Sequence, residues 1–197
     1  MSLLVGACSP STTETTASEV IDLIVSDEQL PPGTYTRSDF TPRVTFEVSG
    51  EWYAVQKAAG FFDIQRDVGS PHVIAVQFGN VEAVFSADGE RVPAASAAEV
   101  VAAVSSNPGL TILGLSGSLM SGLEGSLVEV ENTSQDQQRV IEVPAGALSI
   151  DPGRRLWVAL FDVEDGILAI MVGGSAERWD DALLAAEPIL ETVTIDP

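Results

Sequence analysis

Positive charge is scarce in this sequence. Its 197 residues include 9 lysines and arginines against 29 aspartates and glutamates, which gives a formal net charge of −20 at pH 7. Nucleic-acid binding depends on clustered cations that contact phosphates, so the composition excludes an ordinary nucleic-acid-binding protein. The negative field favours solubility, and it disfavours anionic ligands and anionic lipid headgroups.

Residues that form disulfides or bind metals are also rare. Cys8 is the only cysteine and His72 the only histidine. This excludes an internal disulfide framework, a four-cysteine zinc site and most histidine-based metal sites. The sequence has no glycine-rich phosphate-binding motif, and no apolar run reaches the ~18 residues of a membrane-spanning helix. We therefore predict no metal site and no cofactor.

The single cysteine lies in a pattern typical of bacterial lipoproteins. Val5, Gly6 and Ala7 precede Cys8, as in a lipobox, where the cysteine is acylated and becomes the mature N-terminus. The stretch before Cys8 is shorter than a full signal peptide, so this hypothesis requires a start codon upstream of Met1. The alternative is a free thiol near a disordered end.

The segment after the cysteine fits a tether. Residues 9–18 are mostly serine and threonine and cannot bury enough apolar surface to fold. We predict a residual signal segment at residues 1–7, a lipidated Cys8 with a tether at residues 8–29, and one globular domain at residues 30–197. The membrane contact would be through the lipid alone, on the extracytoplasmic face.

Short apolar runs in the domain predict strands. Residues 44–48 alternate apolar and polar side chains, and residues 72–78 are almost continuously apolar, as in a central strand. Asp165-Gly166 separates two apolar runs, which predicts a hairpin. We expect residues 81–85 to continue the sheet and residues 116–125 to form a small-residue loop.

Two segments predict helices. Ser96 and Glu99 form a capping box before an apolar face, and residues 177–190 carry an apolar stripe with Pro188 near its end. We expect both helices to pack on a mainly antiparallel β-sheet, which makes the fold class α+β. The side chains predicted to be buried are Val100, Val104, Trp157, Trp179 and Leu183.

Several segments within residues 32–195 resemble a group of small bacterial lipoproteins that have a lipobox, a Ser/Thr-rich spacer and one domain. The resembling pieces are Pro32-Gly33-Thr34-Tyr35, Thr45-Phe46 before Trp52, Asn107-Pro108-Gly109-Leu110, Ser121-Gly122-Leu123-Glu124-Gly125 and Pro188-Ile189-Leu190-Glu191-Thr192-Val193. The order of elements is similar to the PsbP-like fold, an antiparallel sheet flanked by helices. The resemblance implies this fold and a lipid anchor, and it supplies no activity.

The sequence contains no complete catalytic motif. The residues around Ser116 approach Gly-x-Ser-x-Gly but lack the last glycine. Asp162, Glu164 and Asp165 could supply oxygen ligands to calcium, yet the EF-hand spacing is absent. A solvated hairpin tip is therefore the simpler interpretation.

Two residues remain as candidates for a ligand rim. Trp52 follows a turn, where an aromatic side chain can stand at the edge of a site, and His72 opens a strand. We predict a lipid-anchored extracytoplasmic binding or accessory domain without catalytic activity, whose partner is an unknown protein or small molecule. The alternative is a hydrolase-like or metal-assisted enzyme that uses His72 or the acidic hairpin from Asp162 to Asp165.

Overall fold

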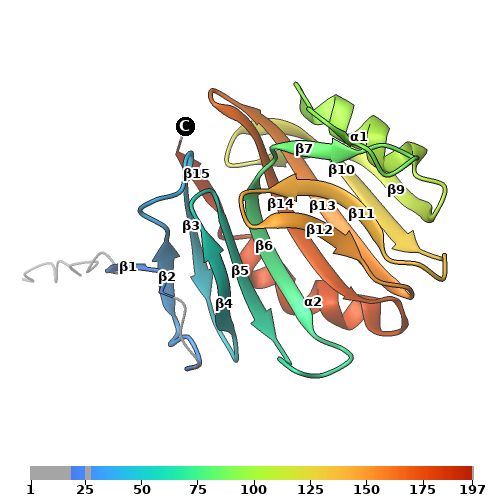
Figure 1. Ribbon diagram of the computed structural model, residues 1–197. Helices are drawn as coiled ribbons and strands as arrows, with labels where there is room; N and C mark the ends of the chain where they lie inside the picture. Colours follow the sequence, from blue (N-terminus) through green and yellow to red (C-terminus); the bar gives the residue numbers. More distant parts are fainter. Residues whose placement is uncertain (1–18, 25–27, 197) are drawn as a thin grey trace, which may run out of the picture.

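A seven-stranded antiparallel sheet forms the centre of the computed structural model, which describes residues 19–24 and 28–196 (Figure 1). The strand order is β4-β5-β6-β14-β13-β10-β9. Their bounds are β4 Tyr53–Ala58, β5 Phe61–Arg66, β6 Ile74–Asn80, β14 Gly166–Ser175, β13 Arg154–Val163, β10 Leu123–Asn132 and β9 Leu110–Met120. The predicted Asp-Gly hairpin is confirmed, because β13 and β14 pair from Arg154↔Ser175 to Val163↔Gly166.

Both faces of this sheet are buried. Leu168, Ile170 and Val172 of β14 belong to one apolar cluster, while Ile167 and Met171, which alternate with them, belong to the other. Side chains alternate between the faces of a strand, so a strand covered on both sides is continuously apolar. This explains why the central strands lack the alternating pattern of residues 44–48.

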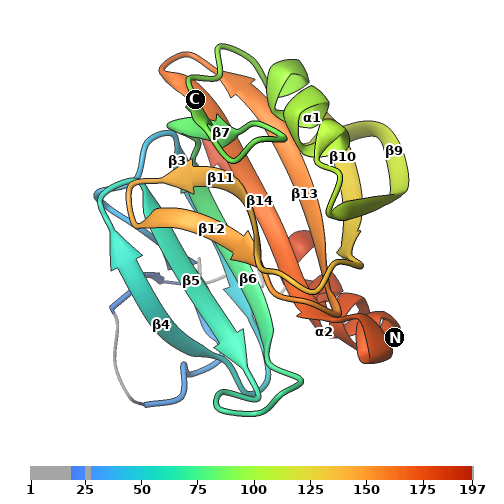
Figure 2. The same cartoon turned by 45° about the vertical axis from the view of Figure 1, so that its right-hand side comes forward.

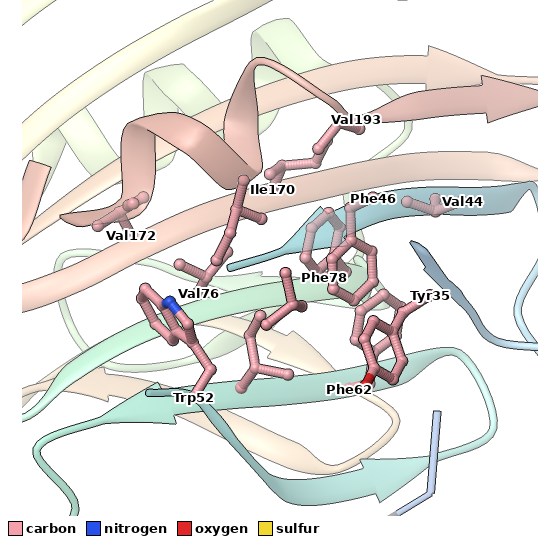
Figure 3. Close-up of a cluster of buried hydrophobic side chains, with 14 of the residues drawn as sticks. Tyr35, Val44, Phe46, Trp52, Phe62, Val76, Phe78, Ile170, Val172 and Val193 are labelled. Atoms are coloured by element: carbon pink, nitrogen blue, oxygen red, sulfur yellow. The ribbon is translucent and has the colours of Figure 1, made fainter. Parts of the chain in front are cut away.

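A small sheet and a helix cover the first face. The sheet has the order β1-β2-β3-β15, and the helix α2 (Trp179–Leu190) follows the short 3₁₀ helix η1 (Ala176–Arg178). Phe46 from the small sheet stacks with Phe62 and Phe78 of the central sheet, and the Phe62–Phe78 centroids lie 4.5 Å apart (Figure 3). The strand bounds are β1 Val20–Asp22, β2 Gly33–Thr36, β3 Arg43–Val48 and β15 Thr194–Asp196.

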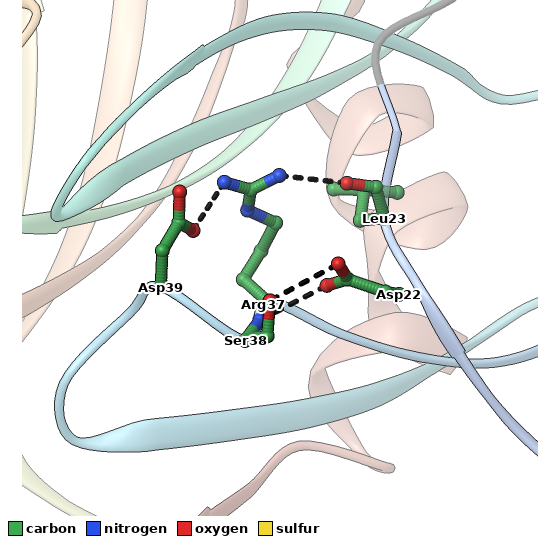
Figure 4. A network of polar contacts seen from close by, with 5 residues as sticks. All are labelled: Asp22, Leu23, Arg37, Ser38 and Asp39. Atoms are coloured by element: carbon green, nitrogen blue, oxygen red, sulfur yellow. Dashed lines mark hydrogen bonds and ion pairs between the residues drawn. The ribbon is translucent and has the colours of Figure 1, made fainter.

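Polar contacts attach β1 to this layer (Figure 4). The buried Arg37 forms an ion pair with Asp39 and donates from Nη1 to the Leu23 carbonyl at 2.7 Å. Ser38 donates from its backbone N–H to Asp22 at 2.9 Å. Strand β1 is thereby held parallel to β2 at the edge of the domain.

A second small sheet and the helix α1 (Ala97–Ser106) cover the other face (Figure 2). The sheet order is β12-β11-β7-β8, with bounds β12 Gly146–Ile150, β11 Gln138–Val143, β7 Ala83–Phe85 and β8 Arg91–Val92. The expectation that residues 81–85 continue the central sheet is wrong. The chain leaves that sheet after Asn80, and β7 pairs with β11 instead.

The predicted loop at residues 116–125 is also wrong. Strand β9 runs through its small residues to Met120, and only Ser121 and Gly122, with φ of 52° and 80°, form the turn into β10. Gly125 is a close-approach position, because a Cβ there would lie 2.4 Å from the Leu160 carbonyl oxygen. The absence of a side chain at Gly125 allows β10 to pack closely against β13.

The architecture confirms the predicted α+β class, with mainly antiparallel sheets and two helices. Val100, Val104 and Trp179 are buried as predicted, whereas Trp157 and Leu183 are only partly buried because they line a groove beside α2. Pro188 lies in the last turn of α2, which ends at Leu190.

Candidate ligand-binding pocket

A cavity of about 300 Å³ lies between the β5–β6 connection and the start of α2. We call it the Arg66 pocket. Its lining residues are Arg66, Asp67, His72, Ile74, Ser175, Arg178, Asp181, Ala182, Leu184 and Ala185. The two walls are about 100 residues apart in the sequence, and the pairing of β6 with β14 brings them together.

The first wall is a tight connection after β5. Asp67 has a φ of 56°, and its carbonyl accepts from the Ser70 N–H at 3.0 Å. The backbone N–H of His72 donates to Ser70 Oγ at 3.1 Å, and the Val73 N–H donates to the Ser70 carbonyl at 3.2 Å. These bonds fix the backbone that carries His72 at the pocket.

Arg154 on the neighbouring strand fastens the same connection. Its Nη2 donates to the Val73 carbonyl at 2.8 Å, and its Nη1 lies 3.5 Å from the Pro71 carbonyl. Burial lowers the pKa of the Arg154 guanidinium, and nearby Asp151 opposes that effect. Arg154 is directly opposite Ser175 of the pocket in the β13–β14 ladder, so it links the two walls.

The second wall begins where β14 ends. Ser175 leads into η1, and Arg178 pairs with Asp181 through Nη2 at 2.6 Å and Nε at 2.8 Å. The apolar side chains of Ala182, Leu184 and Ala185 continue this wall along α2. The pocket is thus polar at one end and apolar along its helical side.

Two nitrogen-bearing side chains of the pocket have unused hydrogen-bonding capacity. The Nδ1 atom of His72 is buried and has no hydrogen-bond partner in the part of the chain that the structure describes. Within those same residues, the Arg66 side chain makes no hydrogen bond or ion pair. An oxyanion bound in the pocket would pair with the Arg66 guanidinium.

The structure separates the two predicted rim residues. His72 lines the pocket, as a rim residue would. Trp52 is only 1% exposed and packs in the core near Val76 and Val172, so its placement at a rim is wrong (Figure 3). The Trp52 carbonyl accepts from the Leu30 N–H at 2.7 Å, just before strand β4 begins. Cys8, the predicted lipidation site, lies outside the described residues.

The residues of the enzyme alternative do not converge. Ser116 is on β9, four strands away from β6, which corresponds to roughly 20 Å. Asp162 is at the opposite end of the sheet from His72, where its Oδ1 accepts from the Ala97 N–H of α1 at 2.7 Å. In the described residues, no three acidic, histidine or cysteine side chains are grouped to hold one metal ion.

Sequence reasoning missed a buried carboxyl group on the central sheet. Asp63 is 3% exposed, and its Oδ2 accepts from Gln65 at 2.8 Å and from Gln77 at 3.3 Å. Its Oδ1 has no partner within the described residues. Burial raises the pKa of Asp63 to about 6, and the two glutamine bonds oppose this shift. No sequence signal marks it, because Phe-Asp-Ile reads as an ordinary exposed polar position.

A second hollow, more apolar, lies further along α2 and shares Leu184 with the Arg66 pocket. Trp157, Leu183, Leu184 and Leu190 line it together with Glu187 and Glu191, and its volume is about 460 Å³. Among the residues that the structure describes, no cationic side chain lines this hollow, and its charged lining residues are the two glutamates. It therefore suits an anion poorly, in contrast to the Arg66 pocket.

Comparisons with known proteins give structural similarities only. No protein-family model matches the chain, and neither does any curated protein sequence. The chain is similar to the solution structure of cyanobacterial PsbP (CyanoP) from Synechocystis sp. PCC 6803, with a TM-score of 0.47 and 10% identity, covering 83% of this chain and 91% of that one. It is also similar to LpqN of Mycobacterium tuberculosis, a protein involved in cell envelope biogenesis, with a TM-score of 0.45 and 10% identity, covering 86% and 90%. Neither similarity says what this chain binds.

Among the residues that the structure describes, no helix combines the length and the apolar character that crossing a bilayer takes.

Proposed function

We propose that this protein is a lipid-anchored extracytoplasmic binding domain whose Arg66 pocket holds a small organic anion, without catalysis. The observation that carries the proposal is the gathering of Arg66, His72 and Arg178 around one cavity in a chain of net charge −20. The overall charge alone disfavours anions. Asp67 and Asp181 also line the cavity, and Arg178 is paired with Asp181, so Arg66 is the cation that remains to bind an anion there. Arg154 adjoins the pocket through its bond to the Val73 carbonyl.

The pocket supplies two kinds of contact to such a ligand. Arg66 offers an unpaired guanidinium, and a guanidinium binds a carboxylate or phosphate with two parallel hydrogen bonds. Ile74, Leu184 and Ala185 offer apolar surface next to these groups. A pocket of this mixed lining favours a short carbon chain that ends in a carboxylate or phosphate.

Calorimetric titration tests the pocket. The probes are hexanoate and inorganic phosphate, with chloride at matched ionic strength as the blank. We expect saturable binding of at least one probe and about a tenfold loss of affinity in Arg66→Gln. Arg91→Gln is the matched control, because it removes the same charge from an exposed arginine paired with Glu142 elsewhere. Equal affinities in both variants, or no binding above the chloride blank, would contradict the proposal.

The anchor belongs to the same proposal. An acylated Cys8 would hold the domain at the membrane without a basic patch, because two or more acyl chains bind stably by burying CH₂ groups at about 0.8 kcal/mol each. Partitioning of the full reading frame into the detergent phase, beside Cys8→Ser, measures this. We expect the unchanged chain to partition into the detergent phase and Cys8→Ser to remain in the aqueous phase. If both forms remain in the aqueous phase, the domain is not lipid-anchored.

A further inference from the structure

The outer edge of strand β9 has no partner strand within the described part of the chain. It ends the seven-stranded sheet and pairs only with β10 among the residues that the structure describes. Both views show β9 at the margin of that sheet (Figures 1 and 2). With 11 residues it is the longest strand of the described chain, so it presents a long row of backbone groups for pairing.

This edge lacks the features that usually protect an edge strand. Residues 110–122 contain no charged residue and no proline, although natural edges are commonly guarded by lysine, proline or inward-pointing charge. Leu113, Leu115 and Leu119 are 43%, 58% and 74% exposed. Large exposed apolar side chains on an unguarded edge mark an interaction surface.

The sequence of the edge is self-complementary. Residues 115–119 read Leu-Ser-Gly-Ser-Leu in both directions. In an antiparallel pair of two copies centred on Gly117, Leu115 lies opposite the partner's Leu119, and Ser116 lies opposite the partner's Ser118. Side chains of a strand alternate between faces, so the leucines meet on one face of the joined sheet and the serines on the other. Directly opposed side chains are the pairs that stabilise a sheet.

We propose that two copies of this chain associate through β9, in antiparallel register with Gly117 on the two-fold axis, and form one continuous sheet. A two-fold interface uses the same patch on both subunits, and the palindrome provides such a patch. The occupant is a second copy of this chain, because the palindrome about Gly117 places leucine opposite leucine and serine opposite serine when both strands have this sequence. The uncharged edge lets two strongly acidic chains approach, while their remaining charges repel, so the association strengthens with salt.

Sedimentation equilibrium at 0.5 M NaCl tests the association. We expect a concentration-dependent dimer for the full chain and about a tenfold or greater weakening in Leu119→Lys. Val92→Lys is the control, because Val92 is 43% exposed on β8, away from β9, and the substitution adds the same charge. A monomer at all concentrations overturns the proposal, and so does a dimer that Val92→Lys weakens as much as Leu119→Lys.

Cross-linking tests the register. In a Cys8→Ser background, Gly117→Cys places two thiols opposite each other across the axis, and opposed strand residues lie within disulfide reach. The site has room, because the nearest atom to a Cβ at Gly117 is 3.9 Å away. Gly114→Cys is the control, since Gly114 would lie opposite the partner's Met120. We expect mild oxidation to give a covalent dimer for Gly117→Cys and much less for Gly114→Cys. Equal yields overturn the register.

Discussion

At the residue scale, Asp63 shows how burial converts an ordinary carboxyl group into a source of pH-dependent stability. Its pKa is about 6 in the folded protein, above its ordinary value of 3.8, because burial penalises the charged form. The folded state therefore binds the proton more tightly than the unfolded state. The stability that this group contributes is present below about pH 4 and is lost as the pH rises through about 6.

Replacing Asp63 by Asn should stabilise the protein at neutral pH. Asn keeps an oxygen that accepts from Gln65 and Gln77 and carries no charge to bury. We expect a gain of about 1–3 kcal/mol in the free energy of unfolding at pH 7.5 and little change at pH 4, measured by urea denaturation. Asp165→Asn at the exposed hairpin tip is the control and should change the value by less than about 0.5 kcal/mol. A variant that is less stable at pH 7.5 would show that the carboxylate is needed.

A second prediction at this scale concerns Gly125. A Cβ there would lie 2.4 Å from the Leu160 carbonyl oxygen and 2.6 Å from the ring of Phe161. Backbone cannot yield as a flexible side chain can, so Gly125→Ala should cost more than about 2 kcal/mol of stability. Gly114→Ala, whose Cβ would meet only Glu129 at 3.8 Å, should cost far less. Thermal unfolding of the two variants separates them, and equal melting temperatures would contradict the packing described.

At the element scale, helix α1 is fixed at its N-terminus by three separate acceptors. Ser96 Oγ accepts from the Glu99 N–H at 3.3 Å, Glu99 accepts from the Ala95 N–H at 2.8 Å, and Asp162 accepts from the Ala97 N–H at 2.7 Å. The last of these comes from β13, so the cap also joins the helix to the sheet. The two carboxylates lie at the positive end of the helix dipole.

Loss of the Ser96 or the Asp162 acceptor should weaken the packing of α1 on the sheet. We expect Ser96→Ala to lower the free energy of unfolding by about 1 kcal/mol and Asp162→Asn to lower it by about 0.5–1 kcal/mol, measured by chemical denaturation. Ser106→Ala at the exposed end of the same helix is the control and should stay within about 0.5 kcal/mol. No loss in either cap variant would mean that tertiary packing alone holds α1.

The elements that could be predicted from the sequence are those whose pattern lies within a few adjacent residues. The capping box at Ser96 and the Asp165-Gly166 hairpin each depend on a few adjacent residues, and both are confirmed. The second half of strand β9, residues 116–120, was predicted as a loop because serines and glycines have low strand propensity, and pairing with β10 supplies the hydrogen bonds that override this propensity. The central strand predicted at residues 72–78 was correct within two residues.

At the scale of the whole molecule, the proposed binding pocket could not be predicted from the sequence. Arg66 and Arg178 are 112 positions apart, and nothing in their neighbourhoods indicates that they meet. They converge because β6 pairs with β14, which carries the chain directly into η1 and α2. His72 was found by its rarity. Trp52 was misplaced because a turn before an aromatic residue does not say which way the side chain points.

The net charge of the whole molecule is also a poor guide to which ligands one pocket can bind. A net charge of −20 describes an average over the surface, whereas binding depends on the charges within a Debye length of the site, about 8 Å at physiological salt. Arg66, Arg178 and the only histidine of the sequence line the proposed pocket together with Asp67 and Asp181. Arg178 is paired with Asp181, so the proposal depends on the Arg66 guanidinium and not on the net charge.

The most direct test of the anion pocket uses its histidine. Because His72 is the only histidine of the chain, a ¹H–¹³C NMR spectrum contains a single set of histidine imidazole resonances, which can be followed without ambiguity. We predict that hexanoate or phosphate shifts these resonances saturably at constant pH and ionic strength, and that the shift is lost in Arg66→Gln and kept in Arg91→Gln. Imidazole resonances that respond to neither anion beyond the chloride blank, or that respond equally in Arg66→Gln, would contradict the account.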